Sequence, residues 1–419
     1  MSVHQAELLL FFTLLQLAII VLAGRIGGSI AIKIGQSAVV GEIILGILLG
    51  PSLFGALAPD IFNWVFRSTS TEPISMLSQI GLIFLMFQIG LEFDFSHLRE
   101  TRHRNAMLSI ATVSMIFPFG FGFAFGTLSA PILCPEANPL GTALFIGTAF
   151  SITALPILGR IMIEFGITST SIGVIAISAA AINDVIGWVL LAMVSALSVS
   201  QFHLQDLGQT ILSIVLFVVI CVFVVRPLMK YSIRRFRSQQ DPLTANLMGL
   251  VIFMIFLSAM TTYKIGIFAI FGGFILGVLL HDEPEFVKSW RSKVGGFVSV
   301  FFLPIFFTYT GLRTNIGSLN TFDLWVWCVL LIALATAGKY GAAYFAARVN
   351  KFSPVESSII GIMMNTRALM ELIVINIGLD LGVISPTVFT MLVLMAIFST
   401  VITTPVLRRQ LPKLGLLRT

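Results

Sequence analysis

An apolar run near the middle of the chain carries a single carboxylate, and this combination limits the fold more than any other feature. Ile172 to Leu197 has the sequence IGVIAISAAAINDVIGWVLLAMVSAL, with Asp184 about midway. Roughly 20 apolar helical residues cross about 30 Å of hydrocarbon, so the run can span a bilayer. An ionised side chain at its centre costs roughly 2.5–3.5 kcal/mol and usually serves a function. The alternative is a buried Asp in a structural hydrogen-bond network.

The composition of the whole chain agrees with a membrane location. Of 419 residues, 57% are hydrophobic and 11% charged, and the mean hydropathy is +1.01. No soluble globular domain approaches these values, so we expect an all-α polytopic membrane protein. The first apolar run begins near Glu7 without a basic segment before it, which predicts a retained helix and not a signal peptide. Three scattered cysteines show no disulfide or metal-ligand spacing: Cys134, Cys221 and Cys328.

The apolar runs predict about thirteen transmembrane helices. They fall near residues 7–25, 38–57, 74–91, 106–129, 139–159, 171–199, 208–229, 242–262, 265–280, 295–312, 323–347, 355–378 and 385–407. An odd number places the termini on opposite sides. Short loops rich in Lys and Arg stay cytoplasmic, which predicts an N-terminus outside and a C-terminus inside. The outer side then holds only three of the 25 basic residues, namely Arg67, Lys264 and Arg313, and the net charge of +6 requires no nucleic acid.

No polar segment is long enough for a soluble regulatory domain. The sequence also contains no GxxxxGK[ST] or GxGxxG run, so nucleotide hydrolysis within this chain is not indicated. We therefore expect no cofactor, and transport that is passive or driven by a gradient.

Two of the predicted helices contain interruptions. In the fifth, Pro156 lacks an amide proton and should free the carbonyl of Ile152 beside the hydroxyl of Thr153. In the twelfth, the triplet Asn365, Thr366 and Arg367 divides an apolar helix. Broken helices in corresponding positions of two halves indicate a midplane site in inverted-repeat transporters. The sequence shows no residue-by-residue repeat, so the symmetry is inferred from the breaks alone.

Other charged residues lie within apolar runs. Lys339, among Gly and Ala residues of the eleventh helix, is either a counter-ion for a carboxylate or a snorkelling side chain, and its depth favours the counter-ion. Arg367 and Glu371 are spaced i,i+4 and could pair. Their pattern favours structure or gating over transport.

Several motifs together resemble the membrane domain of monovalent cation/proton antiporters, in the branch with plant cation/proton exchangers and bacterial K⁺ or Na⁺/H⁺ antiporters. The motifs are GEIILGILLGPSLFG, FLMFQIGLEFD, FSITALPILGRI, AAINDVIGW, FFLPIFFTYTGLRTNIG, AGKYGAAY and NTRALMELIVINIGLDLGVIS. The resemblance implies thirteen helices, a homodimer, and two broken helices that cross beside the transport carboxylate. It also implies a dimerisation part (about 5–95 and 242–313), a linker helix (about 208–230) and a moving, elevator-type core (about 105–200 and 323–410).

Matched by motif, the family's Asn-Asp or Asp-Asp pair corresponds to Asn183 and Asp184, its broken-helix threonine to Thr153 and its core lysine to Lys339. Asn183 cannot ionise, which departs from relatives with two aspartates and leaves the partner of Lys339 open. Asp184 and Thr153 are the expected ligands of an alkali cation, because hard cations prefer oxygen.

These observations predict a secondary antiporter, not an enzyme, that exchanges Na⁺ or K⁺ for H⁺ at Asp184 by alternating access. With a single acid, the exchange should be electroneutral. The expected setting is membrane lipid, in the cell membrane if the source is bacterial. A sodium-coupled symporter of an organic anion is the main alternative, for which Arg367 and Lys339 are the only deep anion partners. An intramembrane enzyme would need facing acids or a nucleophile with its base.

Overall fold

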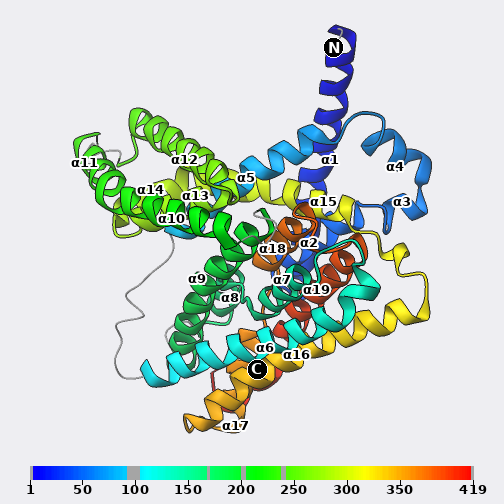
Figure 1. The fold of residues 1–419 in the computed structure, drawn as a ribbon, viewed down its shortest axis with the longest axis vertical. Coiled ribbons are helices and arrows are strands. Elements are labelled where there is room, and N and C mark those ends of the chain that lie inside the picture. The colour runs from blue at the N-terminus through cyan, green and yellow to red at the C-terminus, as the bar shows by residue number, and fades with distance from the viewer. Residues whose placement is uncertain (1–2, 92–103, 168–169, 200–203, 237–241, 417–419) are drawn as a thin grey trace. The chain divides into compact units, whose positions relative to one another are not determined.

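A computed structural model describes residues 3–91, 104–167, 170–199, 204–236 and 242–416, and all regular secondary structure within these ranges is helical (Figure 1). The chain forms two compact units. The first consists of residues 1–23, 58–94 and 195–309, and the second of residues 24–57, 95–194 and 310–419. The predicted dimerisation part, linker helix and moving core are functional assignments and stay predictions.

By length and composition alone, fewer helices of the described residues qualify as membrane spans than the thirteen predicted. Among the described residues, eight helices are long and apolar enough to cross a membrane, or ten if each of two bent pairs forms one span. Three further apolar helices are shorter, namely α2 (Ala38–Leu48), α7 (Pro139–Ser151) and α13 (Ala269–Leu280). The predicted range 38–57 contains Gly50 and Pro51, which lie just after the C-cap Leu49 of α2 and favour a helix end. Thirteen crossings are therefore not confirmed, although each predicted range contains helix.

In the first unit, α5 (Glu72–Leu91) packs against α13 through glycines. A Cβ added to Gly273 would lie 2.5 Å from the carbonyl oxygen of Ile83, and one added to Gly277 would lie 3.0 Å from the Cα of Gly90. Small residues at such positions let two backbones approach closely inside a membrane. The positions of these glycines in the sequence do not reveal which helices they join. α12 (Ala245–Ile265) also packs against α13.

An ion cluster joins α11 (Arg226–Phe236) to the turn after α13 in the same unit. Arg226 donates to Asp282 at 2.9 Å, and Lys230 pairs with the same carboxylate and lies 3.9 Å from Glu283. Partial burial alone would raise the pKa of Asp282, but the hydrogen bonds and charges of Lys230 and Arg226 hold that pKa below its usual value. Because these charged side chains are partly exposed to solvent, we expect the cluster to contribute only modestly to the free energy of unfolding.

The second unit contains every residue that the sequence analysis assigned to the site. α6 (Arg104–Leu133) packs against α7 and α16 (Phe322–Val349), and α6 and α16 run side by side in Figure 1. α16 also packs against α17 (Pro354–Met364) and α19 (Pro386–Gln410), and α18 (Leu369–Asp380) packs against α7 and α19. α8 (Leu155–Glu164) and α9 (Ser171–Val199) follow α7 along the chain.

Acidification should weaken the contact made by Asp282. Its folded-state pKa is lowered, so the stabilisation is complete above the usual Asp value of about 3.9 and is lost as the pH falls through the folded-state value. Asp282→Asn should lower the unfolding free energy at pH 7 by less than about 1 kcal/mol and flatten its dependence on acid pH. Thermal melts in detergent between neutral and acid pH test this. Parallel pH curves for the two proteins would contradict it.

Candidate functional site

The first helix break separates α7 from α8. Asn138 caps the start of α7 by accepting hydrogen bonds from the amides of Leu140 (3.0 Å) and Gly141 (3.1 Å), and α7 ends at Ser151. Residues 152–154 form no helix, and α8 resumes at Leu155. Pro156 is thus the second residue of α8, where its missing amide proton costs nothing. The predicted interruption is confirmed, but it precedes the proline.

The second break separates α17 from α18. Ser353 and Glu356 form a capping box at the start of α17, which ends at Met364, and α18 begins at Leu369 with the pair bent by 41°. The predicted polar triplet occupies the interruption, so this prediction is also confirmed. Ala368 has φ 43° and ψ −118°, and positive φ is uncommon for a residue with a side chain.

The two breaks contact each other, and this contact is called the crossing below. The amide of Ala154 donates to the carbonyl of Thr366 at 2.8 Å, and the hydroxyl of Thr153 donates to the carbonyl of Met364 at 3.0 Å. Backbone groups freed inside hydrocarbon must find partners within the protein. Each break therefore supplies partners for the other, which agrees with the crossing implied by the family resemblance.

Two buried cations cap the broken end of α7. Arg367 donates to the carbonyls of Ala149 (2.7 Å) and Phe150 (2.8 Å), and Lys339 donates to the carbonyl of Ser151. The last carbonyls of a helix lack intrahelical partners and carry the negative end of its dipole, so cations there are favourable. These contacts join residues about 190 or more positions apart, which is why sequence spacing could not reveal them.

Arg367 also pairs with Glu371 at 3.4 Å, with both side chains fully buried. This confirms the pairing predicted from their i,i+4 spacing. A further hydrogen bond from Arg367 reaches the carbonyl of Ala335 in α16 at 3.2 Å. The guanidinium therefore links α7, α16 and, through Glu371, α18, and sequence spacing revealed only the last of these contacts.

Asn183 supplies the second partner of Lys339. We assign the amide orientation that satisfies both of its ends: the nitrogen donates to the carbonyl of Ala111 (2.9 Å), and the oxygen accepts from Ser114 (3.0 Å) and Lys339 (3.1 Å). Lys339 makes no ion pair with Asp184 in this structure. Any action of Lys339 as the charge partner of Asp184 would therefore act across space, without direct contact.

Asp184 differs from its charged neighbours because no described side chain pairs with it. The residue is 2% exposed, and neither carboxylate oxygen has a hydrogen-bond partner among the described residues. The amide of Leu155, at the start of α8, lies near the carboxylate but does not complete a hydrogen bond to it. One turn further along α9, a Cβ added to Gly187 would lie 3.0 Å from the side chain of Ile152. α9 thus lies close against the first break at the level of Asp184.

The same break leaves two buried backbone carbonyl oxygens without hydrogen bonds from described residues. No described donor bonds the carbonyls of Ile152 or Thr153. These carbonyls and the Thr153 hydroxyl are oxygen atoms of the first break, and the amide of Leu155, which follows the break, is near Asp184. Groups of three or more His, Cys, Asp or Glu that suit a transition metal do not occur in the described ranges, whereas oxygen donors suit hard cations.

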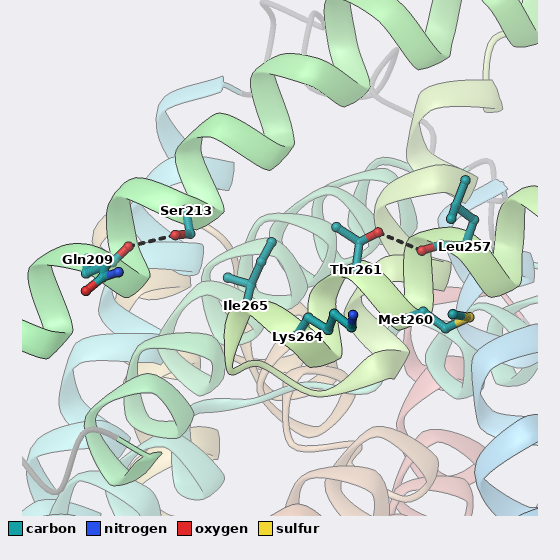
Figure 2. A pocket seen from close by; sticks show the side chains of 7 residues that line it. All are labelled: Gln209, Ser213, Leu257, Met260, Thr261, Lys264 and Ile265. Carbon is teal, nitrogen blue, oxygen red and sulfur yellow. Dashed lines mark hydrogen bonds between the residues drawn. The ribbon is translucent and has the colours of Figure 1, made fainter.

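A separate hollow of about 530 Å³ lies in the first unit between α10 (Leu204–Ile220) and α12, as Figure 2 shows. Its two hydroxyl side chains bond to their own helices: Ser213 donates to the carbonyl of Gln209 at 2.9 Å, and Thr261 donates to that of Leu257 at 2.8 Å (Figure 2). None of the predicted site residues lines it. We do not assign the site to this hollow.

Comparison with known proteins agrees with the geometry. The family described as "Sodium/hydrogen exchanger, transmembrane" matches residues 17–411. The chain therefore belongs to this family of antiporters, and it is an integral, multi-pass membrane transporter and not an enzyme. The resemblance found in its motifs is confirmed.

Individual relatives carry more specific names. The Na(+)/H(+) antiporter NhaS4 of Synechocystis is 40% identical, over 96% of this chain and 98% of that protein. Cation/H(+) antiporter 17 of Arabidopsis thaliana is 36% identical over 94% of this chain but 47% of its own length. K(+)/H(+) antiporter 1 of Saccharomyces cerevisiae is 30% identical over 88% of this chain and 43% of its length. The chain thus spans about half the length of these plant and yeast relatives.

A solved structure shares the fold. The sodium proton antiporter MjNhaP1 of Methanocaldococcus jannaschii matches with a TM-score of 0.65 at 16% identity, covering 98% of this chain and 99% of that one. At this identity the similarity concerns the fold alone.

Removing one member of the buried Arg367–Glu371 pair should be more harmful than removing both. Arg367→Met would leave Glu371 and two α7 carbonyls without their partner, which typically costs about 3–5 kcal/mol. Arg367→Met/Glu371→Met should recover part of that loss, because the buried carboxylate is also gone. Thermal melts of the single and double variants in detergent measure the coupling. Strictly additive losses would show that the pair is not energetically linked.

Proposed function

We propose that this chain exchanges Na⁺ or K⁺ for H⁺ across the membrane, with both ions competing for Asp184. The observation that carries the proposal is a buried carboxylate without a described hydrogen-bond partner, set beside oxygens freed by a helix break. A structural Asp would be expected to bond to its neighbours, as buried polar groups generally do. An Asp that alternately binds a proton and a cation must keep its oxygens available.

The proposed cation ligands are the carboxylate of Asp184, the hydroxyl of Thr153 and the carbonyl of Ile152. The Thr153 hydrogen is engaged by the carbonyl of Met364, which leaves the lone pairs of its oxygen for a cation. Na⁺ and K⁺ are hard cations that suit such ligands. The names of the cyanobacterial and yeast relatives include Na⁺ and K⁺ respectively, and both remain candidates.

We propose that the charge of Asp184 couples cation movement to proton movement. Either a proton or a monovalent cation neutralises Asp184, whereas the bare carboxylate is expensive to carry through a low-dielectric barrier. We propose that the core, about 105–200 and 323–410, moves only when Asp184 is occupied. Alternating access to one fixed site would then enforce exchange.

The proposed stoichiometry is one proton for one cation. Asn183 replaces a second acid and instead accepts a hydrogen bond from Lys339. Glu371, the other deep acid, is paired with Arg367. Asp184 is therefore the acid free to exchange its proton, which supports electroneutral exchange.

The symporter alternative is less well supported. An organic anion would need a deep cation, but Arg367 and Lys339 are engaged by α7 carbonyls, and Arg367 also by Glu371. We further propose a homodimer formed through the part at about 5–95 and 242–313, with the N-terminus outside and the C-terminus cytoplasmic. If the source is bacterial, the proposed location is the cell membrane.

Asp184→Asn should abolish cation-dependent proton movement and leave a folded protein. The amide is close in shape but can neither release a proton nor neutralise a cation. Proteoliposomes that report internal pH after addition of Na⁺ or K⁺ measure the effect, and Asp184→Glu should keep part of the activity with a changed ion preference. Asp380→Asn, at an acid that pairs with Arg313, serves as the control and should keep exchanging. Substantial exchange by a well-folded Asp184→Asn variant would overturn the proposal.

The exchange rate should not respond to membrane voltage. The transmembrane field acts with about 2.3 kcal/mol per elementary charge per 100 mV, so an electrogenic cycle would respond clearly. A potential imposed with an ion that the protein does not carry should leave the rate and the reversal point of exchange unchanged. A reversal point that moves with voltage would reject electroneutral exchange and indicate a second titrating group, with Lys339 and Glu371 as the candidates.

A further inference from the structure

Asn365, the first residue of the second break, is buried without a described hydrogen-bond partner for its side chain. Its exposed fraction is 0%, and neither the oxygen nor the nitrogen of its amide is bonded within the described residues. Buried amides are normally bonded, and each exception requires an explanation. Asn376 in α18 shows the usual state, since its amide bonds to Arg313 (3.0 Å), Thr310 (2.8 Å) and the carbonyl of Leu372 (2.8 Å).

Asn365 lies between two residues that contact the first break. Met364, immediately before it, accepts the hydrogen bond of Thr153, and Thr366, immediately after it, accepts that of Ala154. The backbone of Asn365 therefore lies at the crossing of the two breaks. Leu155, the next residue after Ala154, provides the amide that lies near Asp184.

The other polar side chains of the second break already have partners. Thr366 shares a hydrogen bond of 3.3 Å with Thr403 of α19, and Arg367 is bound to the end of α7. The break closes with Ala368 in a sparsely populated backbone conformation, and such strain tends to concentrate at functional sites. Among the polar side chains of this break, the Asn365 amide is the one without a hydrogen bond to any described residue.

We propose that the amide oxygen of Asn365 is a ligand of the transported cation, contributed by the second broken helix. This inference rests on the proposed function and adds a residue that distinguishes cations. A neutral carbonyl oxygen coordinates Na⁺ or K⁺ but binds no proton at ordinary pH. Asn365 therefore sets cation affinity and choice, whereas proton binding stays with Asp184. Thr153 and Asn365 place one oxygen ligand from each broken helix at the crossing.

The test compares cation binding with stability in the full-length protein. Asn365→Leu has a similar volume and removes both unbonded amide ends, so its cation-free melting temperature should equal or exceed that of the parent. Stabilisation by Na⁺ or K⁺ should require about tenfold more cation, which corresponds to about 1.4 kcal/mol. In proteoliposomes the apparent cation affinity should fall equally, while the proton dependence is retained. Asn365→Gln, which keeps the oxygen but displaces it by one methylene, should change the ratio of the Na⁺ and K⁺ affinities.

Asn376→Leu is the matched control, because it removes a buried and fully bonded amide from the neighbouring helix. It should lower the melting temperature and leave cation affinity unchanged. A folded Asn365→Leu or Asn365→Gln with parental affinities for both cations would overturn the inference, as would an Asn365→Leu that is only less stable. Asp184→Asn separates the two proposals: cation stabilisation that persists in that variant rejects the site at Asp184 itself, whatever Asn365 does.

Discussion

The structure of the second unit depends on how two interrupted helices satisfy their backbone groups inside hydrocarbon. Without water, an unbonded amide or carbonyl is costly, so helices are normally continuous across a membrane. Here the carbonyls of Ala149, Phe150 and Ser151 are bound by Arg367 and Lys339. The crossing supplies further partners through Thr153 and Ala154. The breaks are stable because side chains and backbone from elsewhere in the unit take the place of the missing helical bonds.

This arrangement gives the buried charges different tasks. Arg367 and Lys339 are held by carbonyls, and Glu371 is held by Arg367, so these three groups are engaged by the fold. Asp184 has no such partner among the described residues. A charge that is built into a hydrogen-bond network is poorly suited to leave it in each transport cycle, whereas a free carboxylate can exchange one occupant for another. The contrast supports the proposed mechanism, in which one acid, Asp184, exchanges its proton.

Asn183 lies between the two kinds of buried charge, because it bonds to Lys339 and directly precedes Asp184 in the chain. Its amide accepts from Ser114 and Lys339 and donates to Ala111, and this neutral side chain stands directly before the carboxylate of Asp184. An amide can accept and donate at once without any change of charge. Lys339 thereby has two oxygen partners, the carbonyl of Ser151 and the amide of Asn183. The amide of Asn183 thus takes part in the local packing and supports the proposed stoichiometry.

The sequence by itself determined the membrane class, the central carboxylate, the two interruptions and the pairing of Arg367 with Glu371. These features depend on apolar run length, on polar residues within such runs and on i,i+4 spacing, which are all local. The sequence indicated an interruption at Pro156, whereas α7 ends at Ser151. The difference arises because proline is well tolerated in the first turn of a helix, so Pro156 lies inside α8. Only the tertiary structure decided what Lys339 and Arg367 bind and where Asn365 lies. Those contacts join segments far apart along the chain, so the spacing of residues within one segment cannot predict them.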